Sequence, residues 1–567
     1  HRIMFEAANR LGDMRGDLIG SMCAVTGKTV VEGDVEVSEG IDYARFYTTT
    51  MKKFAALHDV DITSKGTILV ISPWNFPCAI PIGGIVAGLA GGNTVILKPA
   101  TVAAPVAWLF AKAFWDAGVP KEALQVIITD REALKELTTA PAIKHIILTG
   151  GTDTAQSIAR INPSTPLSAE TGGKNAIILT ASGDRDHAIM NIVTSAFGNA
   201  GQKCSACSLL LVERSVYEDK NFQDKLKDAA TSIKVGSVWE AGNVVGPMIT
   251  NRNDKLLQAL TLEPGESWLV PPKFIDEKQY ILAPTVKWGV KPGSYSFRTE
   301  LFGPMLSVAC IDNLQQGIEL VNSLDYGLTS GLQSLDENEQ KLWKDSILAG
   351  NLYITRGITG AIVNRQPFGG MKLSAFGGGV KAGGPNYCAC LVKITDKPES
   401  NTDYKQSYPH AYEEEFAHAR DINKLYGEQN AFRYLPLKNM VLRLFPGDSN
   451  EEAEMIALAT KLCHTPLTIS FDPNDDRTTA LSSTGCTLKK ETLDEFLKTM
   501  RSYERIRTCG ADIPMEMYEE AARRNKYIAT AKPVKNGRVE LIHYIKEQSI
   551  SFEFHRYGSI LDVPPVE

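Results

Sequence analysis

A cysteine and a glutamate that stand beside glycines are the residues of this sequence best suited to covalent chemistry. Cys204 lies within the segment 201–207, and Glu170 precedes two glycines in the segment 170–175. A cysteine thiolate adds readily to a carbonyl carbon, and the thioester that can follow hydrolyses when a base activates water. The glycines leave the carboxylate of Glu170 room to swing toward a site. We therefore predict that Cys204 is a nucleophile and that Glu170 is a general base.

Other interpretations of these two residues compete with that prediction. A buried cysteine often serves as a small hydrophobe, and a loop glutamate is usually solvated. Cys204 and Cys207 also form a C-x-x-C pair, which could be a redox dithiol or half of a zinc site. The sequence has no second C-x-x-C pair, and the spacing of Cys388 and Cys390 does not suit a companion zinc pair. We therefore favour the nucleophile and expect no metal.

An asparagine held between two prolines could complete the chemistry. Asn75 follows Trp74 in the segment 73–77, at the end of a predicted strand. A rigid loop there could aim the side-chain amide at a developing oxyanion, together with the backbone N–H of Cys204. Taken alone, an asparagine between prolines is usually a turn residue.

The early part of the chain has features of a nucleotide site, but no G-x-G-x-x-G fingerprint follows its predicted strands. Lys98 ends a strand predicted over 94–98, and Gly151 stands where a strand turns into a helix. A lysine at the carboxyl edge of a strand could bind a ribose hydroxyl, or it could simply be solvated. The residues alone leave both possibilities open.

Composition narrows the class of protein. The 567 residues carry a formal net charge of −6 and are 43% hydrophobic, which suits an ordinary globular protein with a small-molecule ligand rather than a nucleic-acid partner. Ten cysteines are too few for a disulfide framework in so long a chain. With no signal peptide and no apolar run of membrane-spanning length, we expect a cytoplasmic protein without a transmembrane segment.

The order of predicted elements indicates an α/β fold with several units. Strand-like runs at 67–72, 94–98, 124–129 and 145–148 alternate with helical stretches, which predicts a parallel sheet with helices on both faces. We expect a Rossmann-type nucleotide-binding domain over 1–171, an α/β domain with the nucleophile over 172–358, a loop, return segment and linker over 359–409, and a small α/β domain over 410–567.

The first residues already have a helical pattern. Apolar residues recur at a spacing of three or four from Ile3 to Met22, with no starting methionine and no cap before them. We therefore expect the chain to be a piece of a longer polypeptide.

Four segments together resemble the aldehyde dehydrogenase superfamily: 73–77, 170–175, 201–207 and 300–304. The resemblance extends to about residue 395 and implies that Cys204 is the nucleophile, Glu170 the base and Asn75 the oxyanion donor. It also implies a nucleotide site in which Lys98 binds the adenosine ribose and Gly151 lies near the pyrophosphate. The nicotinamide end would be held by Trp74, Glu300 and Phe302. Thr101 stands where the family often has a glutamate, and losing that carboxylate removes a repulsion against a 2′-phosphate. NADP therefore stays an alternative, although we favour NAD.

A second set of segments resembles the glutamate-γ-semialdehyde dehydrogenases, also called pyrroline-5-carboxylate dehydrogenases. These are Lys203 with Ser205, and the segments 359–363, 366–370 and 381–387. In that group an anchor loop holds the amino-acid end of the substrate. The α-carboxylate would meet the N–H groups of Gly360 and Ala361, the hydroxyl of Ser205 and the charge of Lys203. Phe76 and Phe368 would flank the aliphatic middle, unless both are simply core residues.

That likeness implies oxidation of the semialdehyde to L-glutamate, the second oxidation of proline catabolism. Two alternatives stay open, a dehydrogenase for another semialdehyde such as that of succinate, and a catalytically silent protein on the same scaffold. The segments 426–430 and 435–445 resemble more loosely the C-terminal extension of bifunctional proline utilisation A proteins. There a proline dehydrogenase barrel with FAD comes first, so we expect FAD only in such a barrel, which this chain lacks. For 410–567 we expect a structural role or one in forming a homo-oligomer.

Overall fold

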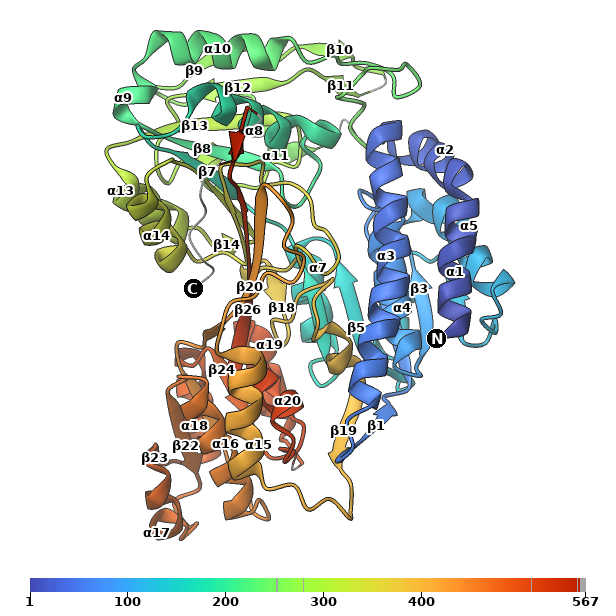
Figure 1. Ribbon diagram of the computed structural model, residues 1–567, viewed down its shortest axis with the longest axis vertical. Coiled ribbons are helices and arrows are strands. Elements are labelled where there is room, and N and C mark those ends of the chain that lie inside the picture. Colours follow the sequence, from blue (N-terminus) through green and yellow to red (C-terminus); the bar gives the residue numbers. More distant parts are fainter. Residues whose placement is uncertain (251–252, 279, 511, 558, 561–567) are drawn as a thin grey trace.

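The structure is a computed structural model that describes residues 1–250, 253–278, 280–510, 512–557 and 559–560. Its N-terminal part begins with the helices α1 (Arg2–Asp13), α2 (Arg15–Thr26) and α3 (Val30–Ala55), which stand side by side in Figure 1. The apolar pattern that predicted one helix over the first residues spans two, because the backbone breaks at Met14. Thr29 caps the start of α3, because its side chain accepts a hydrogen bond from the N–H of Glu32.

The first sheet has six strands in the order β18-β6-β5-β2-β3-β4. Five of them run parallel, and the short β18 pairs antiparallel with β6. Their bounds are β2 (Thr67–Ile71), β3 (Thr94–Lys98), β4 (Leu124–Val126), β5 (Ile143–Thr149), β6 (Leu167–Glu170) and β18 (Ala375–Phe376). The predicted alternation of strands and helices is confirmed for this part of the chain.

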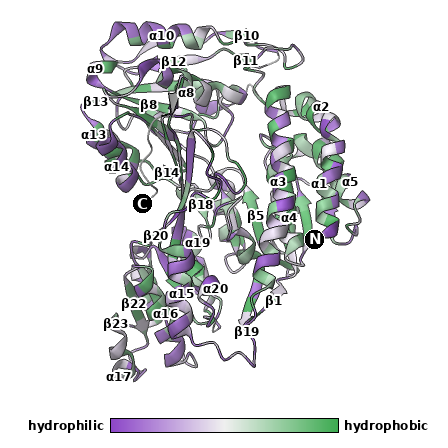
Figure 2. Ribbon diagram, viewed as in Figure 1, coloured by the Kyte–Doolittle hydropathy of each residue, from purple (hydrophilic) through white to green (hydrophobic). Residues whose placement is uncertain are grey.

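Helices cover both faces of this sheet, as expected of parallel strands. α4 (Ala79–Ala90) and α5 (Ala104–Asp116) pack on one face with Val70 and Ile147. α7 (Thr152–Ile161) packs on the other with Leu69 and Ile146, beside α6 (Arg131–Thr139). The strands are largely apolar, as β5 shows in Figure 2. The carboxyl ends of parallel strands meet at one edge, so the end of β3, the turn after β5 and the end of β6 share that edge.

The second sheet has nine strands in the order β20-β26-β16-β15-β7-β8-β13-β12-β9. Helices α8 (Arg185–Phe197), α10 (Lys220–Thr231), α13 (Leu314–Asn322) and α14 (Glu337–Ser346) flank it. The strand bounds are β7 (Asn175–Leu179), β8 (Cys207–Glu213), β9 (Ser267–Val270), β12 (Thr285–Trp288), β13 (Met305–Ile311), β15 (Thr329–Gln333), β16 (Asn351–Ile354), β20 (Glu428–Pro436) and β26 (Ile545–Glu553).

Two of these strands come from the part of the chain that the sequence assigned to a separate C-terminal domain. β26 pairs parallel with β16, where Asn351 lies opposite Ser549, and β20 pairs antiparallel with β26. In Figure 1 these two long strands run between the C-terminal part and the larger sheet. The boundary expected at residue 410 therefore does not separate two sheets, because the chain returns twice to the nine-stranded one.

The rest of the C-terminal part is a small α/β unit, as its pattern indicated. Five parallel strands lie in the order β23-β22-β21-β24-β25, with α16 (Asn450–Leu462) and α19 (Met515–Arg524) packed against them. The strand bounds are β21 (Met440–Arg443), β22 (Leu467–Phe471), β23 (Thr487–Lys490), β24 (Arg505–Arg507) and β25 (Tyr527–Ala529). Among the described residues, none of the helices combines the length and the apolar character needed to cross a membrane.

Candidate active site

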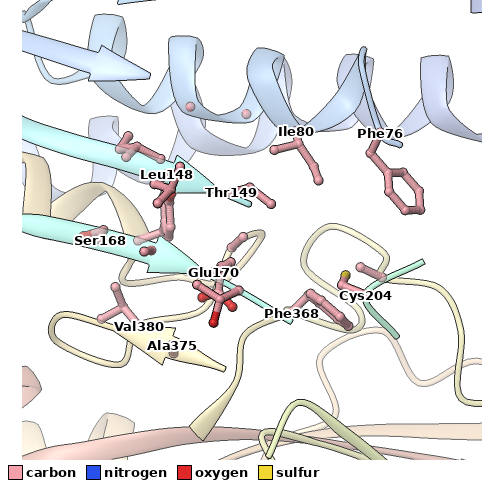
Figure 3. A pocket seen from close by; sticks show the side chains of 18 of the residues that line it. Phe76, Ile80, Leu148, Thr149, Ser168, Glu170, Cys204, Phe368, Ala375 and Val380 are labelled. Carbon is pink, nitrogen blue, oxygen red and sulfur yellow. The ribbon is translucent and has the colours of Figure 1, made fainter. Parts of the chain in front are cut away.

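One cavity brings together many of the residues that the sequence singled out. It lies between the ends of β5 and β6, helix α4 and the glycine-rich loop after residue 359. Figure 3 shows Glu170, Cys204, Phe76 and Phe368 around it. The predicted site residues that line the cavity are Phe76, Glu170, Cys204, Ser205, Gly360, Ala361 and Phe368.

The loop that carries Cys204 is fixed by its neighbours. It enters β8 beside Asn175 of β7, whose amide donates hydrogen bonds to the carbonyls of Cys204 at 2.6 Å and Ala206 at 3.0 Å. Gly201 has a φ of +68°, and a Cβ built on it would lie 2.2 Å from the carbonyl oxygen of Gly303. Only glycine fits such a position. The loop is therefore pinned against the segment 300–304, although the two lie far apart in the sequence.

The thiol of Cys204 is neutral in this environment. Burial raises the pKa of Cys204 to about 12, and the nearby carboxylates of Glu300 and Glu170 act in the same direction. The backbone N–H groups of Ser205 and Cys204 favour the thiolate but do not outweigh burial. Its proton must therefore be taken away when the sulfur attacks a carbonyl carbon.

Glu170 ends strand β6, and its side chain points into the same cavity as the thiol. The N–H of Gly370 donates a hydrogen bond to its Oε2 at 3.2 Å. Burial raises the pKa of Glu170 to about 8, against the opposing charge of Lys381. A carboxyl group that titrates there can both accept and release a proton near neutral pH, which is what a general base requires.

Asn75 and Trp74 lie beside the cavity rather than on its wall. Asn75 is 6% exposed, and its Nδ2 donates to the carbonyl of Gln202 at 2.9 Å. An amide nitrogen has two hydrogens, so one remains for a further acceptor. The Trp74 ring meets the Phe302 ring edge to face, with centroids 5.8 Å apart. Both contacts link the segment 73–77 to the loops around Cys204.

The residues expected to bind a carboxylate divide into two groups. Ser205, Gly360 and Ala361 line the cavity, whereas Lys203 does not. Its ammonium is bound to Glu32 of α3 at 2.7 Å, so the charge already has a partner. The ion pair with Glu32 turns the Lys203 charge away from the role predicted for it, and no local pattern indicates that α3 brings an acid to this lysine.

The expected aromatic flanks have different surroundings. Phe76 lies under the Nζ of Lys28, which is 3.9 Å from the ring centroid. The backbone of Phe368 exchanges two hydrogen bonds of 2.8 Å with Ala382, which fixes its loop. Both rings line the cavity, so neither is a residue of the closed core.

The residues expected to hold a nucleotide lie where the fold offers a site. Lys98 ends β3 half-buried, and no hydrogen bond or ion pair of its ammonium occurs among the described residues; burial lowers the pKa of Lys98. Gly151 precedes α7 without a side-chain cap, so first-turn N–H groups of that helix can face an anion. Glu300 accepts from the N–H of Gly173 at 2.9 Å. These donors and this carboxylate suit a ribose and a pyrophosphate.

Several residues at the site escaped the analysis of the sequence. Glu39 of α3 lines the cavity, and burial raises the pKa of Glu39 to about 8. Lys381 is buried and its charge acts on Glu170, whereas the sequence indicates it only as a member of the segment 381–387. A signal for Glu39 existed, because Glu32, Glu36, Glu39 and Tyr43 share one face of a helix whose other positions are partly apolar. Acidic residues on the face of a helix that packs against the rest of the protein indicate that this face lines a polar cavity.

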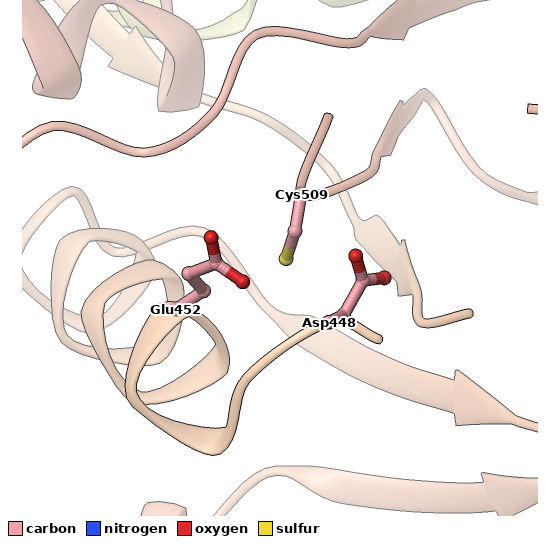
Figure 4. Close-up of side chains that lie close together, drawn as sticks. All are labelled: Asp448, Glu452 and Cys509. Atoms are coloured by element: carbon pink, nitrogen blue, oxygen red, sulfur yellow. The ribbon is translucent and has the colours of Figure 1, made fainter. Parts of the chain in front are cut away.

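A separate group of potential metal ligands lies in the C-terminal unit. Atoms of Asp448, Glu452 and Cys509 are within 4.8 Å of one another (Figure 4). Asp448 accepts from the N–H of Phe445 at 2.8 Å, and Glu452 from that of Ser449 at 2.9 Å as part of a capping box. The two carboxylates therefore have structural roles at the start of α16, and we assign no metal to them.

Comparison with known proteins agrees with this geometry. Residues 1–395 match the model of the aldehyde dehydrogenase family, and the chain belongs to that family. Among curated relatives, a protein of Geobacillus sp. (strain WCH70) named 1-pyrroline-5-carboxylate dehydrogenase is 33% identical over 408 residues, covering 68% of this chain and 78% of that protein. The protein of the same name from Bacillus subtilis (strain 168) is 31% identical over 406 residues, with the same coverage.

Solved structures extend the likeness to the C-terminal part. Proline utilization A (PutA) from Corynebacterium freiburgense superposes with a TM-score of 0.87 and 37% identity over 99% of this chain. This chain spans 57% of the length of that protein. A 1-pyrroline-5-carboxylate dehydrogenase from Thermus, with bound NAD, gives a TM-score of 0.66 and 31% identity over 70% of this chain and 80% of that one.

Proposed function

We propose that this chain oxidises L-glutamate γ-semialdehyde, the open form of 1-pyrroline-5-carboxylate, to L-glutamate with NAD. The observation that carries the proposal is the single cavity that holds Cys204, Glu170 and the anchor residues Ser205, Gly360 and Ala361. The names of the relatives agree with it. In the cell this reaction would be the second oxidation of proline catabolism, and we infer a cytoplasmic location for it.

The reaction begins at Cys204. Its sulfur attacks the aldehyde carbon to form a C–S bond, and the thiol proton passes to solvent, so Glu170 stays ionised for the later hydrolysis. The oxyanion that forms is held by the backbone N–H of Cys204 and by the free hydrogen on the Asn75 amide. These donors are in place before the substrate arrives, because Asn75 is fixed to Gln202.

NAD, when bound, supplies the acceptor for the hydride that leaves the substrate carbon. Lys98 would bind a ribose hydroxyl, and the N–H groups after Gly151 would face the pyrophosphate. Glu300, Phe302 and Trp74 would position the nicotinamide end. We favour NAD over NADP, and measuring both cofactors decides between them.

Glu170 then completes the cycle. It takes a proton from a water molecule, which attacks the thioester on Cys204, and the acid product leaves as the thiol is restored. The residues on the other wall of the cavity would determine which substrate binds. The N–H groups of Gly360 and Ala361 and the Ser205 hydroxyl would donate hydrogen bonds to a substrate carboxylate, while Phe76 and Phe368 would enclose its aliphatic chain.

For the C-terminal part we propose a structural role, with self-association into a homo-oligomer. Its strands β20 and β26 cover the edge of β16, which would otherwise stay unpaired. The likeness to PutA suggests that the chain works beside a proline dehydrogenase domain, and FAD would belong to that domain.

The test is a direct assay of the purified chain. NADH formation is followed by absorbance with NAD and 1-pyrroline-5-carboxylate, and then with succinate semialdehyde. We expect a preference for the former of at least about ten-fold in kcat/KM, because succinate semialdehyde is one carbon shorter and its carboxylate would not reach the anchor residues with its aldehyde at Cys204. Equal rates with both would favour a broader semialdehyde dehydrogenase. Full activity in Cys204→Ala would remove the central assignment.

A further inference from the structure

The buried lysine Lys381 connects Glu170 to β26, the strand of the nine-stranded sheet that comes last in the chain. The Nζ of Lys381 donates to the carbonyl of Gly369, and the N–H of the same peptide unit, which belongs to Gly370, donates to Glu170 Oε2 at 3.2 Å. One peptide unit therefore joins the ammonium to the carboxylate. Hydrogen bonds in series polarise one another, so a positive charge on Lys381 strengthens the bond that Glu170 accepts.

The surroundings leave this arrangement little freedom. Lys381 is 1% exposed, and Asn351 binds both ends of the contact, accepting from Lys381 Nζ at 3.1 Å and donating to the Gly369 carbonyl at 3.2 Å. A Cβ on Gly350 would lie 1.9 Å from that same carbonyl oxygen. The start of β16 therefore fixes the contact between Lys381 and the Gly369 carbonyl.

Glu547 of β26 holds the other side of Lys381. Its Oε2 accepts from the backbone N–H of Lys381 at 2.6 Å, and its Oε1 accepts from Asn386 Nδ2 at 2.8 Å. Burial raises the pKa of Glu547 and lowers the pKa of Lys381, and the attraction between their opposite charges works against both shifts. Arg538 also acts on Glu547, while the neutral Tyr43 and Tyr387 lie near Glu170.

We propose that Glu547 is a positioning residue for the base Glu170, acting through Lys381 and the peptide unit between Gly369 and Gly370. The inference rests on the proposed function, in which Glu170 activates water against a thioester. Glu547 lies beyond residues 1–395, which match the family model. The C-terminal segment thus contributes to the chemistry as well as to the fold.

The effect works through charge and needs no proton transfer along the chain of contacts. Without the carboxylate of Glu547, the buried ammonium of Lys381 loses a counter-charge and is neutral over more of the pH range. Glu170 then loses the cation that favours its ionised form. The base becomes available only at higher pH, whereas attack by Cys204 on the aldehyde is less affected.

The test compares the parent chain with Glu547→Gln in two measurements, the first burst of NADH and the steady-state rate, each across pH 6 to 10. We expect a burst within about two-fold of the parent, and an acid limb of the steady-state profile that moves up by about one pH unit. Near pH 7 the steady-state rate should fall about ten-fold. A merely structural role would lower both measurements without moving the limb.

Three further variants serve as controls or as independent tests. Glu547→Asp retains the charge and should stay near the parent profile. Glu504→Gln breaks the ion pair with Lys546, the neighbour of Glu547 on β26, and should leave the profile unchanged. Lys381→Met should move the limb as Glu547→Gln does, and a folded Lys381→Met with the parental limb would overturn the inference even if Glu547→Gln does not fold.

A folded Glu547→Gln with the parental profile would overturn the inference, and so would an equal shift in Glu504→Gln. Absence of NADH formation by the parent chain with NAD and 1-pyrroline-5-carboxylate would instead count against the proposed function.

Discussion

Burial works against the charged form of both side chains on which catalysis depends. The thiol of Cys204 and the carboxyl of Glu170 line one cavity, and burial raises the pKa of each, to about 12 and about 8. The neutral thiol is protected from other reactions until a substrate is present. The carboxyl, in turn, titrates close to the pH at which an enzyme works.

Removing the base should separate the two halves of the reaction. In Glu170→Gln we expect one burst of NADH and a steady-state rate lowered by about a hundred-fold or more, because water is no longer activated against the thioester. Stopped-flow absorbance measures both phases, and mass spectrometry should find the acyl group on Cys204. Unchanged turnover in this variant would assign the base to another residue.

The pH dependence follows from the direction of the Glu170 shift. The base acts in its ionised form, and burial raises its pKa to about 8, so steady-state turnover should rise with pH through that value. Measured between pH 6 and pH 9.5 with saturating substrate and NAD, the acid limb should lie well above the usual glutamate range. A flat profile across that interval would contradict the assignment.

Single residues of the site could be predicted where a residue's type and its neighbours indicate chemistry. They could not be predicted where two partners lie far apart in the chain. Cys204 and Glu170 could be singled out because their types and neighbouring glycines are informative, whereas Phe368 was expected only from the resemblance; the structure brings all three to one cavity. The partner of Lys203 could not be foreseen, since Glu32 is 171 residues away and no local pattern connects them. Their roles in catalysis stay predictions.

At the scale of single elements, small residues decide how closely loops and helices approach. A Cβ on Gly84 of α4 would lie 2.9 Å from Val70 of β2, and one on Gly88 would lie 2.7 Å from Val95 of β3. The helix can therefore sit directly on the sheet below the cavity. This packing fixes Phe76 at the start of the helix and the strand ends beneath it.

The loop before Cys204 gives a sharp test of such an approach. Gly201→Ala should lower the free energy of unfolding by about 2 kcal/mol or more, since its φ is +68° and the new Cβ would meet the Gly303 carbonyl. It should also reduce the burst rate, because Cys204 would move. Denaturant unfolding and stopped-flow absorbance measure the two effects.

The matched control is Gly20→Ala in helix α2. No heavy atom lies within 4 Å of a Cβ built there, so we expect a gain of about 0.5 to 1 kcal/mol and an unchanged burst. Equal stability in the Gly201 and Gly20 variants would mean that the loop before Cys204 can relax.

Elements were predicted well where their signals are local. The strand over 94–98 has the bounds that its pattern indicated. The pairing of β26 with β16 was not foreseen, because Asn351 and Ser549 meet across almost two hundred residues and a strand pattern does not name its partner. For the same reason the domain boundaries stay proposals.

At the scale of the whole molecule, the C-terminal part should be needed for a soluble protein. A chain truncated after residue 409 loses β20 and β26 and leaves β16 as an open edge of an apolar sheet. We expect it to aggregate and to lose steady-state activity. Size-exclusion chromatography and the NADH assay measure both.

Co-expression of residues 410–567 as a second chain is the control for that truncation. If the two strands can add to the sheet from outside, solubility should return at least in part. A truncated chain that is monodisperse, as stable as the parent and fully active would show that the sheet does not depend on its last strands.

The place of β26 in the chain has a consequence for how the molecule is made. Synthesis proceeds from the N-terminus, and every other strand of the nine-stranded sheet precedes residues 545–553. While a ribosome is still adding those residues, β16 lacks the partner that β26 supplies, so we expect the nascent protein to expose that strand edge for longer than a protein closed by local pairing. Rare codons just before this strand would prolong that exposure and lower the yield of folded enzyme.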